Sequence, residues 1–188
     1  MNRKDVITIP IPDHILKWAK KAAVELDREN DGENTQDGGS DKNVKGNLGQ
    51  WAVSKYLTDS NLKHTYEKPY VKEQYGDRFD IEFCGDIWDV KCRGWWSEEW
   101  WLNNNIFMTL REQKEAMKPD HKKTDYYIFC TVDKEWKNIY ILGVKSFVKV
   151  WSELKDLTER ELKHTVIDTA GTVSVRSLTP IKKHIWRA

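Results

Sequence analysis

The chain lacks long apolar runs, a P-loop and any glycine motif of the kind that binds dinucleotides. No apolar stretch approaches the roughly 20 residues needed to cross a bilayer. The opening MNRKDVITIPIPDH also lacks the apolar core of a signal peptide. We therefore expect an intracellular, cytoplasmic protein with no membrane partner and no nucleotide cofactor.

Cysteine is scarce as well. Cys84, Cys92 and Cys130 are odd in number and show no C-x-x-C spacing, which favours reduced structural thiols over a disulfide or a zinc site. The histidines are scattered and follow no Ser-His-Asp order, so the sequence gives little support to histidine-based catalysis. The net charge of +1 does not by itself indicate a polyanionic partner.

Tryptophan is abundant, with ten residues. Trp95, Trp96, Trp100 and Trp101 lie close together in GWWSEEWWLNNN. Aromatic side chains fill cores and interfaces, so packing and contact with a partner protein are two interpretations. Stacking on unpaired bases is a third, and the sequence leaves all three open.

With 188 residues, the chain is long enough for one domain with a substantial core. Asp13 can cap a helix that runs to about residue 28, and the polar stretch 29–43 is expected to be a mobile loop. We therefore divide the chain into residues 1–43, a helix with a mobile polar loop, and a core domain over residues 44–188.

A second helix is predicted from about Val44 to Leu57. Gly46 and Gly49 in its first turns would let another backbone approach closely. Its predicted packing side consists of Leu48, Trp51, Ala52, Lys55 and Tyr56.

Strands are predicted to dominate residues 63–93, beginning with one over 65–71. A helix over 109–117, strands over 125–132 and 138–144, an amphipathic helix from Ser146, a short strand and a basic segment complete the chain. This order predicts an α/β (α+β) fold with a central mixed β-sheet flanked by helices.

Residues 79–93, FDIEFCGDIWDVKCR, contain the most informative pattern. Two apolar runs flank Cys84-Gly85, which predicts a hairpin with a two-residue turn. In that register Asp80 lies directly across from Asp89, and Lys91 shares their face because side chains alternate along a strand. The opposite face would be core, formed by Phe79, Ile81, Phe83, Trp88 and Val90.

Two carboxylates and a lysine on one face are suited to a hard divalent cation and a hydrolytic water. A solvated strand surface would show the same residues, and a three-residue turn would place Asp80 and Asp89 on opposite faces. The hairpin alone therefore leaves both interpretations open.

With its neighbouring elements, the hairpin resembles the PD-(D/E)xK nuclease superfamily. Asp80 matches the first aspartate of that motif, and Asp89-Val90-Lys91 matches its D-x-K. The segment GNLGQWAVSKYL resembles the helix that precedes the core, with Gln50 where an acid is frequent. Asp77 is a rival first aspartate, although the hairpin register favours Asp80. The resemblance implies a restriction endonuclease-like core.

The resemblance also implies a Mg²⁺-dependent deoxyribonuclease of recombination, repair or restriction type, in which Mn²⁺ can substitute. Asp80, Asp89 and the Val90 carbonyl would hold the metal, and Lys91 would orient the attacking water. Gln50 would hold a water by hydrogen bonding. Many nucleases of this fold act as dimers, so a homodimer is expected from the resemblance.

DNA contacts are expected at two places. Arg93 follows Lys91 on the same strand face and is a candidate phosphate clamp, or an ordinary exposed arginine. Lys182, Lys183 and Arg187 form a basic tail that could contact DNA or simply be solvated. The alternatives to a nuclease are a non-catalytic nucleic-acid-binding protein that keeps the fold, and an interaction protein with a tryptophan-rich surface.

Overall fold

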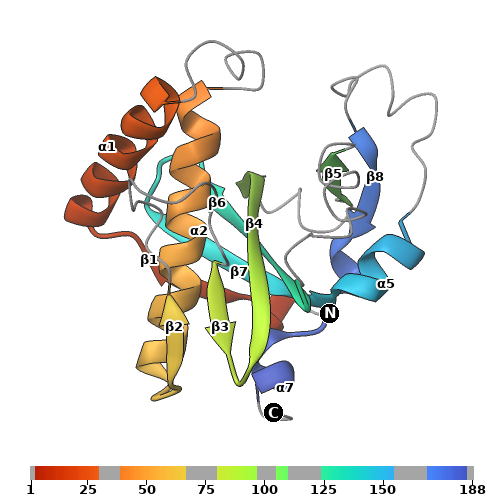
Figure 1. The fold of residues 1–188 in the computed structure, drawn as a ribbon. Coiled ribbons are helices and arrows are strands. Elements are labelled where there is room, and N and C mark those ends of the chain that lie inside the picture. Colours follow the sequence, from red (N-terminus) through yellow and green to blue (C-terminus); the bar gives the residue numbers. More distant parts are fainter. Residues whose placement is uncertain are drawn as a thin grey trace.

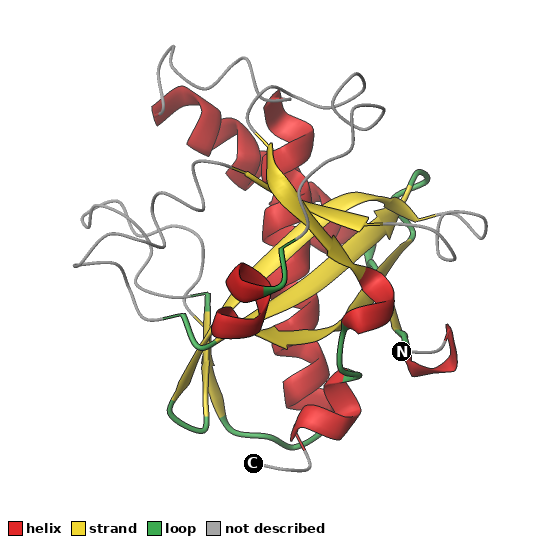
Figure 2. Ribbon diagram, turned by 90° about the vertical axis from the view of Figure 1, so that its right-hand side faces the viewer, coloured by secondary structure: helices red, strands yellow, loops and turns green. Residues whose placement is uncertain are grey.

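The computed structural model describes residues 3–29, 39–66, 80–96, 105–109, 124–154 and 169–185. The fold is mixed α/β, as predicted, with a six-stranded sheet covered on one face by two long helices, α1 (Asp13–Glu29) and α2 (Gly39–Asp59). Figure 1 shows these helices side by side, and in the turned view of Figure 2 the long helices lie behind the strands.

The sheet is mixed because one pair of its strands is parallel. Its order is β1 (Ile7–Pro10), β7 (Asn138–Ser146), β6 (Tyr126–Asp133), β4 (Asp86–Trp96), β3 (Ile81–Phe83) and β2 (His64–Tyr66). The β4–β6 pair is parallel and the other four pairs are antiparallel. The central mixed sheet expected from the order of elements is therefore confirmed.

Strand β6 is buried from Tyr127 to Asp133 because both faces of the sheet are covered there. Ile128 and Cys130 face the core under α1 and α2, while Tyr127 and Phe129 face a second core. The second core contains residues of β5 (Asn105–Thr109), β8 (Thr169–Ser174) and the short helix α5 (Phe147–Ser152). Strand β4 thus lies inside the sheet, between β6 and β3.

Helix α1 forms where the sequence predicted it, but α2 begins at Gly39 rather than near Val44. Asp41 and Lys42 in its first turn are exposed, so this part of the helix needs no apolar residues. An acidic residue in the first turn also suits the helix dipole. The boundary expected between residues 43 and 44 consequently falls inside a helix.

Residues before this boundary share the core of the rest of the chain. Strand β1 pairs with β7, and Ile9 and Ile11 are buried. The two long helices are also linked, because Asn47 Nδ2 donates a 3.2 Å hydrogen bond to the Ala19 carbonyl.

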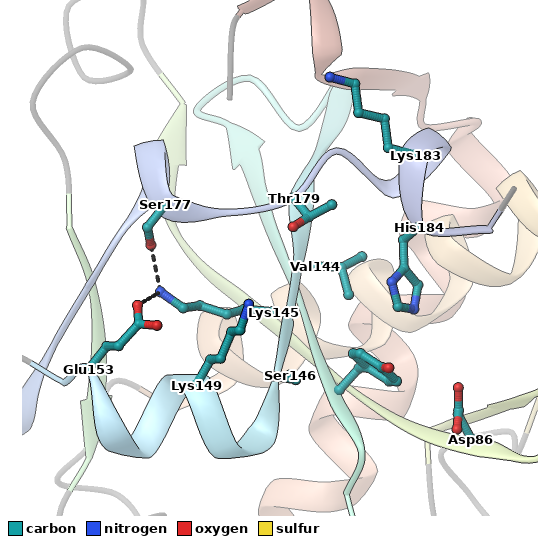
Figure 3. Close-up of a pocket in the computed structure, with 11 residues that line it drawn as sticks. Asp86, Val144, Lys145, Ser146, Lys149, Glu153, Ser177, Thr179, Lys183 and His184 are labelled. Carbon is teal, nitrogen blue, oxygen red and sulfur yellow. Dashed lines mark hydrogen bonds and ion pairs between the residues drawn. The ribbon is translucent and has the colours of Figure 1, made fainter. Parts of the chain in front are cut away.

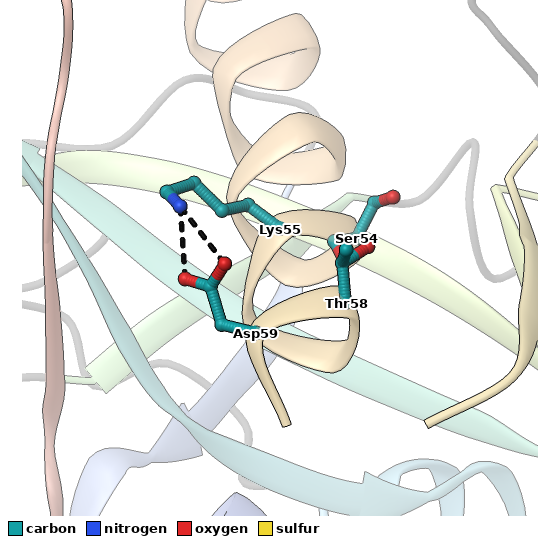
Figure 4. A network of polar contacts seen from close by, with 4 residues as sticks. All are labelled: Ser54, Lys55, Thr58 and Asp59. Atoms are coloured by element: carbon teal, nitrogen blue, oxygen red, sulfur yellow. Dashed lines mark hydrogen bonds and ion pairs between the residues drawn. The ribbon is translucent and has the colours of Figure 1, made fainter. Parts of the chain in front are cut away.

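The packing side of α2 differs from the prediction at one residue. Leu48 and Ala52 are fully buried, but Lys55 has a side chain that is 39% exposed and forms an ion pair of 2.8 Å with Asp59 (Figure 4). Val53 and Leu57 are buried instead. An ammonium group at the helix flank remains hydrated and paired, whereas an apolar side chain gains from burial.

Strands β6 and β7 confirm the two predicted strands over 125–132 and 138–144. The strand predicted over 65–71 is described only as far as Tyr66, in β2. The helix predicted over 109–117 lies outside the described residues except for Thr109, which ends β5.

The amphipathic helix expected from Ser146 is α5, in which Val150 is buried. The C-terminal basic segment contains a short helix, α7 (Ile181–Ile185). Within the described part of the chain, no helix is both long and apolar enough to cross a membrane.

Candidate functional site

The β3–β4 hairpin has the predicted two-residue turn. Cys84 and Gly85 adopt φ values of 53° and 85°, as a tight hairpin turn requires. Ile81 pairs with Trp88 and Phe83 with Asp86, which is the register expected from the sequence. The predicted core residues Ile81, Phe83, Trp88 and Val90 are buried, while Phe79 lies outside the described residues.

Asp80 immediately precedes β3, and its carboxylate makes two hydrogen bonds to other elements. Oδ2 accepts one of 2.6 Å from the Val90 backbone N–H, and Oδ1 accepts one of 2.7 Å from Gln50 Nε2. Asp80 thus takes the place of a backbone partner for β4 and also connects the sheet to α2.

The direction of the Val90 backbone follows from its neighbours. Ile87 donates its N–H to Asp125 Oδ2, and its carbonyl accepts from the Asp125 N–H, at 2.8 Å each. Since backbone groups alternate sides along a strand, those of Val90 point the other way, toward the β3 side. The Val90 carbonyl and the Asp80 carboxylate are therefore directed to the same edge of β4.

Asp89 and Lys91 flank Val90 in the sequence and form an ion pair. Their Oδ2 and Nζ atoms are 2.9 Å apart, with side chains 28% and 20% exposed. The Lys91 ammonium also lies 5.8 Å from the centroid of the Tyr127 ring, within range of a cation–π interaction. Two contacts therefore hold Lys91 in place from the side of the second core.

The predicted shared face is thus modified at Asp80. Register alone would place its carboxylate above Asp89, where two like charges repel. Since the described part of β3 begins at Ile81, the Val90 N–H has no strand partner among the described residues, and the Asp80 carboxylate accepts its hydrogen bond instead. Asp80 therefore lies at the strand edge, beside Val90, rather than over the Asp89–Lys91 pair.

Gly49 explains how Gln50 reaches Asp80. A Cβ atom at Gly49 would lie 2.8 Å from the Cβ of Cys92 and 3.2 Å from Cγ1 of Val90. This close approach confirms the role predicted for Gly49, whereas Gly46 has no neighbour within 4 Å of a Cβ atom. Because Gly49 has no side chain, α2 can lie against β4. The side chain of the following residue, Gln50, then reaches Asp80.

Two buried polar atoms near Asp80 have no hydrogen-bond partner among the described residues. They are Gln50 Oε1 and the Tyr66 hydroxyl. Burial, together with the negative charge of Asp80, raises the pKa of Tyr66, so the hydroxyl keeps its proton. Buried polar groups are normally satisfied, so these two atoms are suited to a bound water or ligand.

The oxygen donors fit a hard divalent cation. Asp80, Asp89 and the Val90 carbonyl are the oxygen type that Mg²⁺ prefers, and Mg²⁺ commonly binds through one or two carboxylates while keeping several waters. Among the described residues, no three His, Cys, Asp or Glu side chains gather into a metal-binding group.

The predicted DNA-contacting residues fall in separate places. Arg93 is half-buried on β4, two residues beyond Lys91, while Lys182 and Lys183 are exposed on α7. The next residue of α7, His184, has its ring 5.6 Å from that of Trp88, so α7 packs near the hairpin end of β4. Arg187 lies outside the described residues, as do Asp77 and two of the clustered tryptophans, Trp100 and Trp101.

Sequence reasoning did not identify Lys45, Tyr66 or Tyr127 as neighbours of this site. Burial lowers the pKa of Lys45, which lies one helical turn before Gly49, while the Cys92 and Asp41 side chains oppose this shift. The four-residue spacing of Lys45 and Gly49 on α2 was a usable signal. The positions of both tyrosines depend on strand pairings that a sequence pattern does not specify.

Comparisons of the chain with protein families, curated proteins and solved structures give no match. The functional assignment therefore depends on the chemistry of the residues themselves.

Proposed function

We propose that the protein is a metal-dependent nuclease that hydrolyses DNA phosphodiester bonds, on a restriction endonuclease-like core. The observation that carries this proposal is the pairing of Asp80 with the Val90 N–H at 2.6 Å. This bond directs a carboxylate to the strand position from which Asp89 and Lys91 branch on either side.

The metal would be held by Asp80, Asp89 and the Val90 carbonyl. Bound there, Mg²⁺ would polarise the scissile phosphate and lower the pKa of a coordinated water. Asp80 is already fixed by two hydrogen bonds, so little conformational freedom would be lost when it becomes a ligand. Asp89 would exchange its contact with Lys91 for the cation.

Lys91 would then be free to interact with the attacking water and the substrate phosphate. Its ammonium is 2.9 Å from Asp89 Oδ2 and lies beside the Tyr127 ring. When Asp89 binds the metal instead, the cation–π contact with Tyr127 would still hold the Lys91 ammonium in place. From there it can orient the attacking water and stabilise the negative charge that develops on the phosphate oxygens.

Gln50 supports the site as a hydrogen-bonding residue. Its Nε2 holds Asp80, and its buried Oε1 can accept a hydrogen bond from a water at the site. A neutral amide cannot act as a strong base, so water activation falls to the metal and to Lys91. Arg93, two residues beyond Lys91 on β4, would hold an adjacent DNA phosphate.

The test is digestion of linear, circular, branched and single-stranded DNA with Mg²⁺ or Mn²⁺. We expect cleavage that EDTA abolishes and that falls about a hundredfold or more in Lys91→Ala and Asp80→Asn. An asparagine side chain at position 80 can still accept a hydrogen bond from the Val90 N–H, but it carries no negative charge. Lys20→Ala, an exposed change on α1, is the matched control and should cut like the unmodified protein. Equal activity of Lys91→Ala and Lys20→Ala would refute the assignment.

A second candidate is a non-catalytic nucleic-acid-binding protein with the same fold. Gln50 favours it, because an amide supplies no negative charge to a metal. DNA binding that persists across metals and substrates without any cleavage would select this candidate. Gel-shift and digestion assays on the same preparation separate the two.

A further inference from the structure

A cavity of about 570 Å³ lies at the hairpin end of β4, away from the Asp80 edge. Its walls come from the start of β4, the start of β6, the end of β7, α5 and residues 177–184 (Figure 3). Val144 and Thr179 exchange two backbone hydrogen bonds of 2.8 and 2.9 Å, which fix two of these walls together. A cavity of this size suits a small organic ligand.

One end of the cavity is cationic. Lys145 is nearly buried, and its ammonium is 2.8 Å from both Glu153 Oε2 and Ser177 Oγ. Lys149 is exposed and also lies near Glu153, because both ammonium groups help to lower the pKa of that carboxyl. Figure 3 shows Lys145, Lys149 and Glu153 at one end of the cavity.

The cationic end carries more positive than negative charge. Glu153 is the carboxylate that contacts Lys145, and its side chain is 53% exposed. Among the described residues, Lys149 has no carboxylate within ion-pair distance, and it lines this end of the cavity. A buried lysine and a second lysine near by can hold a phosphate group.

The other end is aromatic. The rings of Tyr126 and His184 meet edge to face with centroids 4.3 Å apart, and both residues line the cavity. Asp86 lies at this end, where burial and the nearby Asp125 raise the pKa of its carboxyl while His184 opposes the shift. A planar ring can pack on these aromatic side chains, and a carboxylate can accept a hydrogen bond from an amino group on the ring.

We propose that this cavity binds a nucleoside monophosphate, with its phosphate at Lys145 and Lys149 and its base against Tyr126 and His184. The proposal does not depend on the nuclease function, since the cavity shares no residue with the Asp80 site.

Glu153 would compete with the bound phosphate for the Lys145 ammonium. Its carboxylate occupies the Lys145 ammonium that the ligand would use. Glu153→Gln removes this competing negative charge and leaves the buried Lys145 ammonium without a carboxylate partner. The substitution keeps the shape of the cavity wall and should therefore strengthen phosphate binding.

The experiment is isothermal titration of the full chain with adenosine monophosphate in EDTA, a condition that excludes metal-dependent cleavage. We expect Lys149→Ala to weaken binding about tenfold or more, as loss of a charged hydrogen bond does. Glu153→Gln should tighten binding several-fold, and the Lys20→Ala control should leave it unchanged. Inorganic phosphate should compete for the site, and adenosine alone should bind much more weakly than the monophosphate.

The same variants distinguish the monophosphate from the phosphates of DNA. A short DNA duplex whose binding depends on Lys149, without any binding of adenosine monophosphate, would overturn the nucleotide assignment and identify a backbone contact. Absence of monophosphate binding, or equal affinities for Lys149→Ala and Lys20→Ala, would also overturn it. Circular dichroism of each variant verifies that a loss of binding is not a loss of fold.

Discussion

Gln50 Nε2 donates a 2.7 Å hydrogen bond to Asp80 Oδ1, and this bond joins helix α2 to the residue just before β3. The sequence places these two residues 30 positions apart. A neutral amide here stabilises the carboxylate, whereas an acid at the same position would repel it in the absence of a cation.

Gln50→Glu should therefore lower the free energy of unfolding in EDTA by about 1.5–3 kcal/mol, the range for a hydrogen bond to a charged group. Mg²⁺ should recover most of this loss, because a cation bound between carboxylates removes their repulsion. Denaturant unfolding with EDTA and with Mg²⁺ measures both effects. A variant as stable as the unmodified protein in EDTA would show that the amide does not support Asp80.

Gly49→Ala should destabilise the protein by roughly 1–3 kcal/mol, because its Cβ would lie 2.8 Å from the Cβ of Cys92 and push α2 away from β4. Gly46→Ala is the matched control on the same helix, where a Cβ atom meets nothing within 4 Å. It should stabilise by about 0.5–1 kcal/mol through helix propensity. Urea unfolding of the two variants should show shifts of opposite sign.

The three thiols should differ in reactivity. Cys84 is exposed in the hairpin turn, whereas Cys92 and Cys130 are buried. Burial raises the pKa of Cys92 to about 12 and that of Cys130 well above its usual range, so neither forms the reactive thiolate near neutral pH. Mass spectrometry after brief alkylation at pH 8 should find one modified cysteine, Cys84, and three after unfolding. Rapid alkylation of Cys92 in the folded protein would contradict this burial.

Stability should fall at alkaline pH. Cys92 keeps its proton to a pKa of about 12 in the folded state, against an ordinary value of 9.0, and the pKa of Tyr66 is also raised. Above about pH 9 the unfolded chain therefore binds fewer protons than the folded one, so the free energy of unfolding decreases as the pH rises toward 12.

Tyr66→Phe provides the control for this pH dependence. It keeps the ring but removes a buried hydroxyl that has no partner among the described residues, so stability at pH 7 should be maintained. The loss of stability above pH 10 should become shallower. Thermal unfolding measured from pH 7 to pH 11 gives both slopes, and identical slopes would rule out a contribution from Tyr66.

The local parts of the site were predictable from the sequence. The turn at Cys84-Gly85 sets the hairpin register, and the register places Lys91 beside Asp89 on one face. The start of helix α1 at Asp13 also followed from the sequence, although Asp13 lies in the first turn and the Pro12 carbonyl accepts the first helical hydrogen bonds. Each of these features depends on residues close together in the chain, where turn and helix rules act directly.

The non-local parts were not predictable. Asp80 turns to the strand edge because the Val90 N–H donates its hydrogen bond to the Asp80 carboxylate and to no strand partner among the described residues, and this depends on where β3 begins. Asp86, Lys145 and His184 line one cavity although they are far apart in the sequence, so only the tertiary fold places them there. Helix α2 begins earlier than expected because exposed polar residues leave no periodic signal.

The pairing of β1 with β7 has a practical consequence for handling the protein. Ile7 and Ile9 lie opposite Ile141 and Ile139, so β1 covers the outer side of a largely buried strand. Removal of the first ten residues would leave a row of unpaired amide and carbonyl groups along an apolar strand. Such a strand can pair with another chain, so a truncated protein should self-associate.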